Sequence, residues 1–272
     1  MKLFLKILAA IAVILILSVT MLYAFQEKLI FLQSTLPADY TFQFDEDFEE
    51  FNLKNQDGAV LNAIHLKAEK PKGVIVYYHG NAGTLDRWGD VASYFTQYNY
   101  DVIIMDYRGY GKSTGELSEK ALYEDAQLFY DYAKNQFQED QIFVYGRSLG
   151  TGIATYVAAN NNPAMLLLET PYLNLTDIAS RRFPILPMDR LLKYKFPSDE
   201  FITETTCPIV IFHGTADGVV PYESGRALGD LVPQERLEFI TVPDGKHKNL
   251  IEFDEYRNAI KKIMGNTPSK TL

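Results

Sequence analysis

The sequence predicts an α/β fold, with a mostly parallel β-sheet flanked by helices on both faces. One observation is a series of short, continuous apolar runs, a pattern typical of strands that are buried on both faces of a parallel sheet. A second is that helical segments separate these runs, because alternation of strand and helix builds an α/β sheet. The runs lie at residues 74–78, 102–105, 142–145, 165–168, 209–212 and 237–242.

The composition is that of a globular protein, and the length of 272 residues suits one large domain. Acidic residues outnumber basic ones by 35 to 26. The net charge of −9 repels the phosphates that dominate nucleic-acid affinity, so we expect no nucleic-acid partner. The single cysteine, Cys207, has no companion for an intramolecular disulfide or a zinc site. The sequence therefore implies no metal and no organic cofactor.

The chain begins with an apolar segment that is long enough to cross a bilayer. Residues 7–25 carry no charge, and a helix of this length, at about 1.5 Å per residue, approaches the roughly 30 Å of a hydrocarbon core. A cleavable signal needs small residues at the first and third positions before the cut. A cut after Ala24 would place the larger Leu22 at the third position. We therefore expect an uncleaved signal anchor over residues 1–25, with a cleaved signal or a helix docked on the domain as alternatives.

The charges on either side of this segment predict its orientation. Lys2 and Lys6 precede it, whereas Glu27 and Lys28 cancel each other after it. The positive-inside rule then places the N-terminus in the cytoplasm. We expect a single-pass membrane protein whose remaining residues, 26–272, form one globular domain on the periplasmic, extracellular or lumenal side.

Further elements are predicted around the sheet. Residues 48–54 and 60–67 flank the turn cluster Asn-Gln-Asp-Gly and predict a hairpin. Residues 118–135 carry apolar side chains at intervals of three and four, which predicts an amphipathic helix capped by Ser118. The proline-containing interval 171–207 interrupts the alternation, and we expect a short cap there, over the C-terminal edge of the sheet.

A candidate nucleophile lies between a predicted strand and a predicted helix. The sequence Gly-Arg-Ser-Leu-Gly at residues 146–150 directly follows the run at 142–145 and opens an alanine-rich helical segment at 151–159. A glycine-flanked serine is often only a tight turn. Between a strand and a helix, however, this pattern is typical of a strained turn that exposes a serine Oγ. Ser148 is therefore the candidate nucleophile.

At these residues the chain resembles the α/β-hydrolase superfamily, from about residue 48 to residue 263. The resemblance implies an α/β-hydrolase fold in which a carboxylate and then a histidine follow the serine, because a serine needs a base that a carboxylate holds in place. Of the four histidines, His213 and His247 follow Ser148. His213 ends a predicted strand, where a packing role is expected. His247, in the loop after the last strand, is the candidate base, with an ordinary loop histidine as the alternative.

The candidate acid is Asp217. In similar hydrolases the loop after the strand at 209–212 supplies the carboxylate, and Asp217 lies in that loop. A plain Asp-Gly turn is the alternative. Asp244 is a reserve candidate, although it lies three residues before His247 and its loop would have to fold back tightly. Asp106 precedes the serine and does not fit the chain order.

Acyl transfer also needs hydrogen-bond donors aimed at the developing oxyanion. In this fold one donor is the N–H of the residue after the nucleophile, here Leu149. By resemblance Asn81, within His-Gly-Asn-Ala-Gly at residues 79–83, supplies the other N–H. This glycine-rich turn lacks the Lys-Ser/Thr of a phosphate-binding loop, so no nucleotide site is expected.

Four motifs behind one anchor are similar to those of a particular subgroup. Two of them are His-Gly-Asn-Ala-Gly at 79–83 and Gly-Arg-Ser-Leu-Gly at 146–150. The other two are Asp-Tyr-Arg-Gly-Tyr-Gly-Lys-Ser at 106–113 and His-Gly-Thr-Ala-Asp at 213–217. They resemble the membrane-anchored α/β-hydrolase domain-containing proteins related to yeast budding-emergence hydrolase, which include lysophospholipases and protein depalmitoylases. Lys246 and Lys248 depart from the small or polar neighbours that the histidine usually has in this subgroup, and this departure bears on the charge of the substrate.

The predicted cap carries a local positive charge within an acidic chain. Between residues 181 and 195 five basic residues stand against one acid, interleaved with apolar residues. One interpretation is an apolar acyl entrance with a basic rim for anionic headgroups, close to the membrane. The other is an ordinary cap helix with one packed and one solvated basic face. The candidate cap residues are Phe183, Leu186, Leu191, Arg181 and Arg182.

The resemblance and the motifs together predict a membrane-anchored serine hydrolase. We expect it to cleave carboxylic or thio esters of acyl lipids or acylated molecules, through a Ser-His-Asp triad and an acyl-enzyme. A peptidase or amidase with the same triad is one alternative. A non-catalytic binding module on the same fold is another, because fold alone does not establish function.

Overall fold

Eight strands form one mixed sheet within residues 1–265, the part of the chain that the computed structural model describes. Their order is β1-β2-β4-β3-β5-β6-β7-β8. β1 (Phe48–Lys54) and β2 (Val60–Leu66) form the predicted antiparallel hairpin, and β2 is also antiparallel to β4. All other neighbours are parallel, which confirms the mostly parallel α/β sheet. The parallel strands are β3 (Gly73–Tyr78), β4 (Tyr100–Met105), β5 (Ile142–Arg147), β6 (Met165–Glu169), β7 (Ile209–Gly214) and β8 (Leu237–Val242).

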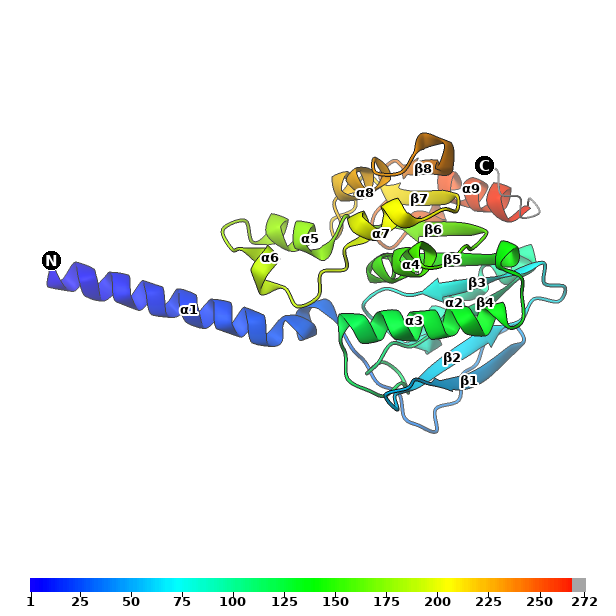
Figure 1. Ribbon diagram of the computed structural model, residues 1–272, viewed down its shortest axis with the longest axis horizontal. Helices are drawn as coiled ribbons and strands as arrows, with labels where there is room; N and C mark the ends of the chain where they lie inside the picture. Colours follow the sequence, from blue (N-terminus) through cyan, green and yellow to red (C-terminus); the bar gives the residue numbers. More distant parts are fainter. Residues whose placement is uncertain (266–272) are drawn as a thin grey trace.

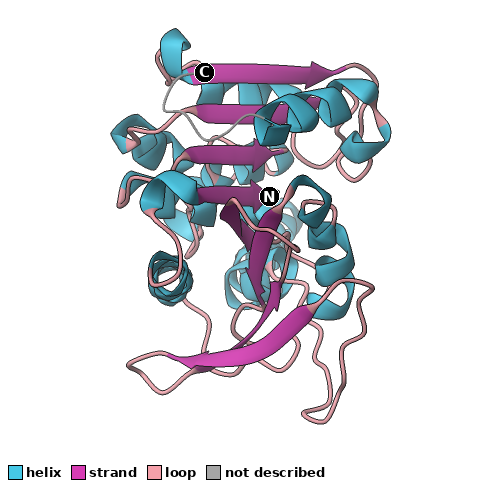
Figure 2. Ribbon diagram, turned by 90° about the vertical axis from the view of Figure 1, so that its right-hand side faces the viewer, coloured by secondary structure: helices cyan, strands magenta, loops and turns pink. Residues whose placement is uncertain are grey.

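Burial on both faces of the sheet explains the continuous apolar runs. Along β3, Val74, Val76 and Tyr78 pack in one core layer and Ile75 and Tyr77 in the other, because successive side chains of a strand point to opposite faces. Figure 2 shows helices on both sides of the sheet, and a strong twist from one edge to the other. The helices that supply the layers are α2 (Leu85–Ser93) and α9 (Asp254–Gly265) on one face, and α3 (Glu119–Lys134), α4 (Leu149–Ala159) and α8 (Tyr222–Gly229) on the other.

α3 has the cap and the buried face that the sequence predicts. Ser118 Oγ accepts a hydrogen bond from the Ala121 N–H at 3.1 Å and so satisfies one of the free donors of the first turn. Leu122, Ala126 and Phe129 are fully buried against the sheet. Short 3-10 helices complete the secondary structure at Thr96–Tyr98, Glu139–Gln141, Gln234–Arg236 and Leu250–Glu252.

The proline-containing interval between β6 and β7 forms three short helices. They are α5 (Leu175–Arg182), α6 (Met188–Leu191) and α7 (Ser198–Glu204). α7 packs against α4 in the body of the domain. α5 and α6 instead project from the domain on the same side as α1 (Figure 1). The projecting part of the predicted cap is therefore shorter than the interval 171–207.

α1 (Lys2–Ile30) extends away from the domain as a long helix whose apolar side chains are largely exposed (Figure 1). By length and composition it is suited to cross a membrane. Its C-terminal end is fastened to the domain. The Gln26 side chain donates to Leu191 O at 3.2 Å and accepts from the Lys193 N–H at 2.7 Å. Just beyond the helix, the buried Phe31 ring lies 4.8 Å from that of Tyr194.

Candidate active site

Ser148 lies in the sharp turn that joins β5 to α4. Its backbone adopts φ 51° and ψ −118°, a strained conformation for a residue with a side chain. The turn closes because its neighbours lack side chains: a Cβ on Gly146 would collide with Ala154 and α4 backbone, and one on Gly150 with the Tyr78 carbonyl. The glycines thus allow the close strand-to-helix packing that the sequence predicts around this serine.

The structure brings Ser148, His247 and Asp217 into one hydrogen-bonded line. His247 Nε2 lies 2.8 Å from Ser148 Oγ, and His247 Nδ1 lies 2.8 Å from Asp217 Oδ2. The three residues follow β5, β8 and β7, whose carboxyl ends meet at one edge of the sheet. With the Nδ1 proton donated to the carboxylate, Nε2 is free to accept the serine proton.

The environment of Asp217 keeps its carboxylate ionised. The side chain is fully buried, and this burial acts to raise its pKa. The hydrogen bond and charge of His247, together with the Val219 and Val220 N–H groups at 2.8 and 2.9 Å from Oδ1, outweigh the burial. The pKa of Asp217 therefore lies below its ordinary value, and the carboxylate can hold the imidazole ring at neutral pH.

The other candidates that follow the serine lie elsewhere. His213 is fully buried in β7, with Nε2 at 3.1 Å from Val220 O, and burial lowers its pKa. It packs behind the Asp217 loop, with Nε2 3.6 Å from Asp217 Oδ2. Asp244 is exposed and has φ 57°, and its backbone N–H donates to Thr215 Oγ1 at 2.9 Å. The carboxylate beside His247 is therefore that of Asp217.

Asn81 lies in the loop after β3, next to Ser148. A Cβ on the preceding residue, Gly80, would lie 3.7 Å from Ser148 Cβ. The Asn81 carbonyl accepts from the Leu32 N–H at 3.0 Å and from the Tyr110 hydroxyl at 2.8 Å. Leu149 is the first residue of α4, where backbone N–H groups have no intrahelical acceptor. The loop after β3 and the start of α4 thus flank the serine.

Asn81, Ser148 and His247 line a pocket of about 230 Å³. Its basic side chains are Arg87, Arg147 and Lys248. Arg147 pairs with Glu169 at 3.1 Å and donates to Lys248 O at 3.2 Å, whereas the Arg87 guanidinium lies 5.0 Å from the centre of the Trp88 ring. The full lining is Leu32, Gly80, Asn81, Ala82, Arg87, Trp88, Arg147, Ser148, Val219, His247 and Lys248.

Several of these lining residues are not recognisable from the sequence. Arg147 stands inside the Gly-Arg-Ser-Leu-Gly motif, which was a usable signal for proximity to the serine. Arg87 and Trp88 lie on α2, and Leu32 follows α1, with no motif to mark them. Only the fold brings these elements to one pocket.

The cap residues do not line this pocket. Arg181, Arg182 and Phe183 line a separate groove of about 510 Å³, and Leu191 lines a smaller cavity of about 100 Å³ against α1. Leu186 lies between α5 and α6 and lines none of these three spaces. Four of the five predicted cap residues therefore lie at spaces other than the pocket that contains Ser148.

A buried acid supports the loop that carries Asn81. Asp106 Oδ1 lies 3.6 Å from His79 Nε2, and Asp106 Oδ2 accepts from the Leu85 N–H at 3.2 Å. Burial raises the pKa of Asp106 to about 8 and lowers that of His79 to about 4. Burial therefore favours the uncharged forms of both groups at neutral pH. Asp106 lies outside the hydrogen-bonded line of Ser148, as the chain order predicts.

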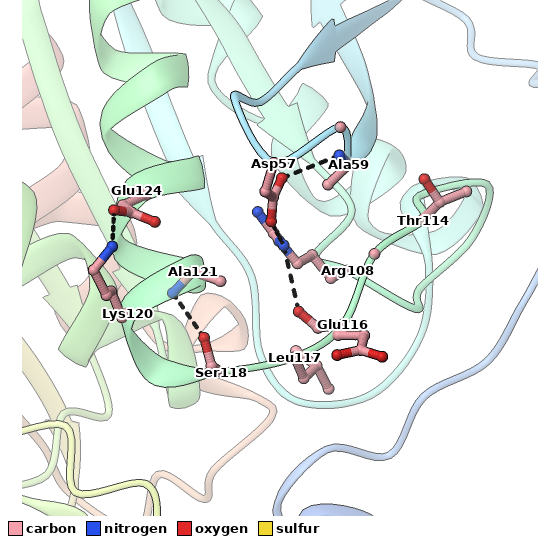
Figure 3. Close-up of a pocket in the computed structure, with 12 residues that line it drawn as sticks. Asp57, Ala59, Arg108, Thr114, Glu116, Leu117, Ser118, Lys120, Ala121 and Glu124 are labelled. Carbon is pink, nitrogen blue, oxygen red and sulfur yellow. Dashed lines mark hydrogen bonds and ion pairs between the residues drawn. The ribbon is translucent and has the colours of Figure 1, made fainter.

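Another large pocket, of about 650 Å³, contains none of the predicted site residues (Figure 3). Arg108 lies in it and is fully engaged: it pairs with Asp57 and makes two hydrogen bonds to Asp125, at 2.6 and 2.8 Å. A paired guanidinium has little charge left for a ligand. This pocket is a structural ion-pair cluster at the start of α3.

The sheet carries helices on both faces, and a serine on a strand-to-helix turn lies beside a histidine and a carboxylate. Together these features define an α/β-hydrolase. The chain belongs to the α/β-hydrolase superfamily. Within it, the serine aminopeptidase S33 family matches residues 69–198.

Relatives and solved structures agree with this assignment. The chain is 32% identical over 189 residues to the lysophosphatidylserine lipase ABHD12 of Danio rerio. The matched region covers 60% of this chain and 48% of that protein. The Xenopus tropicalis protein of the same name is 30% identical over 71% of this chain and 58% of its own length. An uncharacterized protein of Mycobacterium tuberculosis is 27% identical over 92% of this chain and 90% of its own. The chain thus spans about half the length of the ABHD12 relatives it matches.

Solved esterases share the fold. The Pyrococcus furiosus esterase Pf2001 superposes with a TM-score of 0.66 at 15% identity, over 86% of this chain and 98% of that one. Acetyl xylan esterase 1 from Thermoanaerobacterium gives a TM-score of 0.67 at 17% identity, over 85% and 86% of the two chains. At these identities the likeness shows a common architecture.

Proposed function

We propose that this protein is a membrane-anchored serine hydrolase that cleaves carboxylic or thio esters of acylated lipids. Ser148 is the nucleophile, His247 the general base and acid, and Asp217 the group that orients the imidazole. The observation that carries this proposal is the pair of 2.8 Å contacts that join Ser148 Oγ to His247 Nε2 and His247 Nδ1 to Asp217 Oδ2. This geometry suits transfer of the serine proton to the imidazole.

The reaction proceeds through an acyl-enzyme. Ser148 Oγ attacks the ester carbonyl carbon while His247 Nε2 takes the hydroxyl proton. The N–H groups of Asn81 and Leu149 stabilise the oxyanion of the tetrahedral intermediate. The bond to the alcohol then breaks, and His247 returns the proton to the leaving oxygen. Water, activated by the same imidazole, releases the acid and restores the serine.

The charges of the pocket favour an anionic lysophospholipid as substrate. Arg87 and Lys248 are exposed at the pocket. Because the net charge of the chain is −9, these side chains form a basic site on an otherwise acidic protein. The relatives named lysophosphatidylserine lipases bear the name of an anionic monoacyl lipid. We infer that the basic side chains bind the headgroup while the ester carbonyl lies at Ser148.

The anchor is part of the same proposal. α1 would hold the domain, residues 26–272, at the membrane in which the lipid resides. Lys2 and Lys6 at its start favour a cytoplasmic N-terminus, with the site on the periplasmic, extracellular or lumenal side.

A peptidase with the same triad is the second candidate, and the match to the serine aminopeptidase S33 family favours it. An aminopeptidase binds the positively charged amine of its substrate, which calls for a carboxylate in the pocket. The residues that line the pocket around Ser148, within the described part of the chain, include three basic side chains and no acidic one. This charge favours the ester hydrolase.

A fluorophosphonate probe and matched substrates test the proposal. The full-length protein should label at Ser148, and Ser148→Ala should abolish labelling and lower ester turnover by on the order of 10⁶-fold. Ser180→Ala on α5 is the matched control and should label normally. Faster cleavage of an amide than of its matched ester would establish the peptidase. If the probe does not label the wild type, the non-catalytic binding module is the remaining interpretation.

A further inference from the structure

We propose that the groove between the end of α1 and α5 binds the acyl chain of the substrate, which enters it sideways from the membrane leaflet. The groove has a volume of about 510 Å³ and adjoins the pocket around Ser148. This inference rests on the proposed lipid-ester hydrolase and adds to it where the acyl chain lies and how it arrives.

Most of the residues that line the groove are apolar, with Arg181 and Arg182 as the charged exceptions, and they come mainly from three parts of the chain. α1 contributes Leu29 and Ile30, and the loop after β7 contributes Val219 and Pro221. α5 and the residue that follows it supply the third wall, with Leu175, Ile178, Ala179 and Phe183. An aliphatic chain is the ligand that such walls suit, because its burial there removes apolar surface from water.

The groove and the catalytic pocket share one lining residue, Val219. This side chain lines both spaces and is 58% exposed, so the core does not cover it. Its backbone N–H donates to Asp217 Oδ1 at 2.8 Å, which fixes the loop beside the triad. Ile30 also lines the groove, and Leu32, two residues further along the chain, lines the pocket. An ester held at Ser148 can therefore direct its acyl chain over Val219 into the groove.

The groove also lies at the level of the membrane surface. The uncharged stretch of α1 ends at Phe25, and Leu29 follows about 6 Å further along the helix. Gln26 is buried against the cap and Glu27 accepts from the Tyr194 hydroxyl at 3.2 Å, so the end of the helix is fixed to the domain. With α1 anchored in a bilayer as proposed, the groove would lie within a few ångströms of the boundary of the hydrocarbon core.

An exposed apolar tip beside the groove supports this position. Ile185, in the turn between α5 and α6, is 94% exposed. In Figure 1 α5 and α6 project on the side from which α1 leaves the domain. The exposed Arg182 also lies at the groove, where it suits a layer of anionic headgroups. Insertion of Ile185 between lipid headgroups would open the groove directly to the leaflet.

A chain-length series on groove variants tests the inference with full-length protein in phosphatidylcholine vesicles. p-Nitrophenyl esters from butyrate to palmitate should show a kcat/KM that climbs roughly fourfold per added methylene until the groove is full. Ala179→Trp, which fills the groove, should flatten the climb. Ser180→Trp, at the neighbouring position of α5 outside the lining, is the matched control and should keep it. Equal climbs in the two variants would overturn the groove.

Two further measurements keep the outcome interpretable. Leu29→Asn places a polar group in the groove at a side chain that is 60% exposed, so it should fold normally and also reduce the climb. The rate of fluorophosphonate labelling reports the triad without using the groove. A wild type that labels at Ser148 yet shows a flat chain-length series refutes the acyl groove and leaves the hydrolase intact. Loss of labelling from the wild type refutes the hydrolase itself.

Discussion

The Asn81 side chain donates a hydrogen bond to the carbonyl oxygen of Ile30 at 3.0 Å. This contact joins the loop after β3 to the last residue of α1. The Leu32 N–H donates a hydrogen bond of 3.0 Å to the Asn81 carbonyl. Two hydrogen bonds therefore join Asn81 to the segment at the end of α1. The chain that leaves α1 thus supports the loop that is proposed to stabilise the oxyanion.

Asn81→Ala should therefore lower kcat more than it raises KM. The substitution keeps the backbone N–H but removes the hydrogen bond that positions it, and loss of one oxyanion donor costs about 10²- to 10³-fold in kcat. We expect a loss of at least about tenfold, with slower fluorophosphonate labelling. Gln33→Ala, in the same segment, removes a 3.3 Å hydrogen bond to Arg108 O and is the control. An equal effect of both variants would indicate general loosening of the segment.

Asp217→Asn should lower kcat/KM by on the order of 10⁴-fold, because the amide no longer selects the productive tautomer of His247. Asp244→Asn is the control, since Asp244 is exposed in the loop before His247. Steady-state kinetics on a short p-nitrophenyl ester measures both. If Asp244→Asn causes the larger loss, the assignment of the acid is wrong.

Arg87→Gln and Lys248→Gln should each weaken turnover of an anionic lysophospholipid more than of a zwitterionic one. Each exposed charge pair contributes up to about 1 kcal/mol, which corresponds to a loss of about two- to fivefold in kcat/KM. Added salt should reduce the difference. Lys246→Gln removes a charge next to His247 but outside the pocket, and it is the matched control. Equal losses on both lipids would argue against a headgroup site.

The burial of Asp106 predicts a fall in stability as the pH rises. Burial raises its pKa to about 8 from an ordinary 3.8, so the folded protein keeps a proton that the unfolded chain has lost. The free energy of unfolding should then decrease by about 1.4 kcal/mol per pH unit between these values. His79, whose pKa is lowered to about 4 from 6.5, contributes the opposite slope between those two values and offsets that of Asp106 there. The net fall in stability is therefore expected between about pH 6.5 and 8.

Asp106→Asn should remove this slope between pH 6.5 and 8. Urea unfolding of the detergent-solubilised protein, followed by the fluorescence of the single tryptophan, Trp88, measures it. Leu117→Ala, which shortens a partly buried apolar side chain packed against the core, is a control that should shift stability equally at every pH. A wild type and an Asp106→Asn variant with equal pH slopes would show that Asp106 is ionised in the folded state.

Local patterns in the sequence determined the strands, the hairpin and the helix after Ser118, because burial and capping leave their mark at short spacing. The serine at 148 was recognisable for the same reason: its glycines and its flanking strand and helix are contiguous in the chain. Chain order, taken from the resemblance, then pointed to Asp217 and His247.

Only the tertiary structure decided which side chains meet. Asp244 is three residues from His247 but points to solvent, whereas Asp217, thirty residues away, reaches Nδ1 because β7 and β8 are neighbours in the sheet. One interpretation of the local composition was that the basic cap residues bind the headgroup of the substrate. The fold instead places Arg87 from α2 beside Ser148, and gives the groove next to it a wall from α1. Sequence spacing records which residues share a face of one element, but packing between elements determines which faces enclose a pocket.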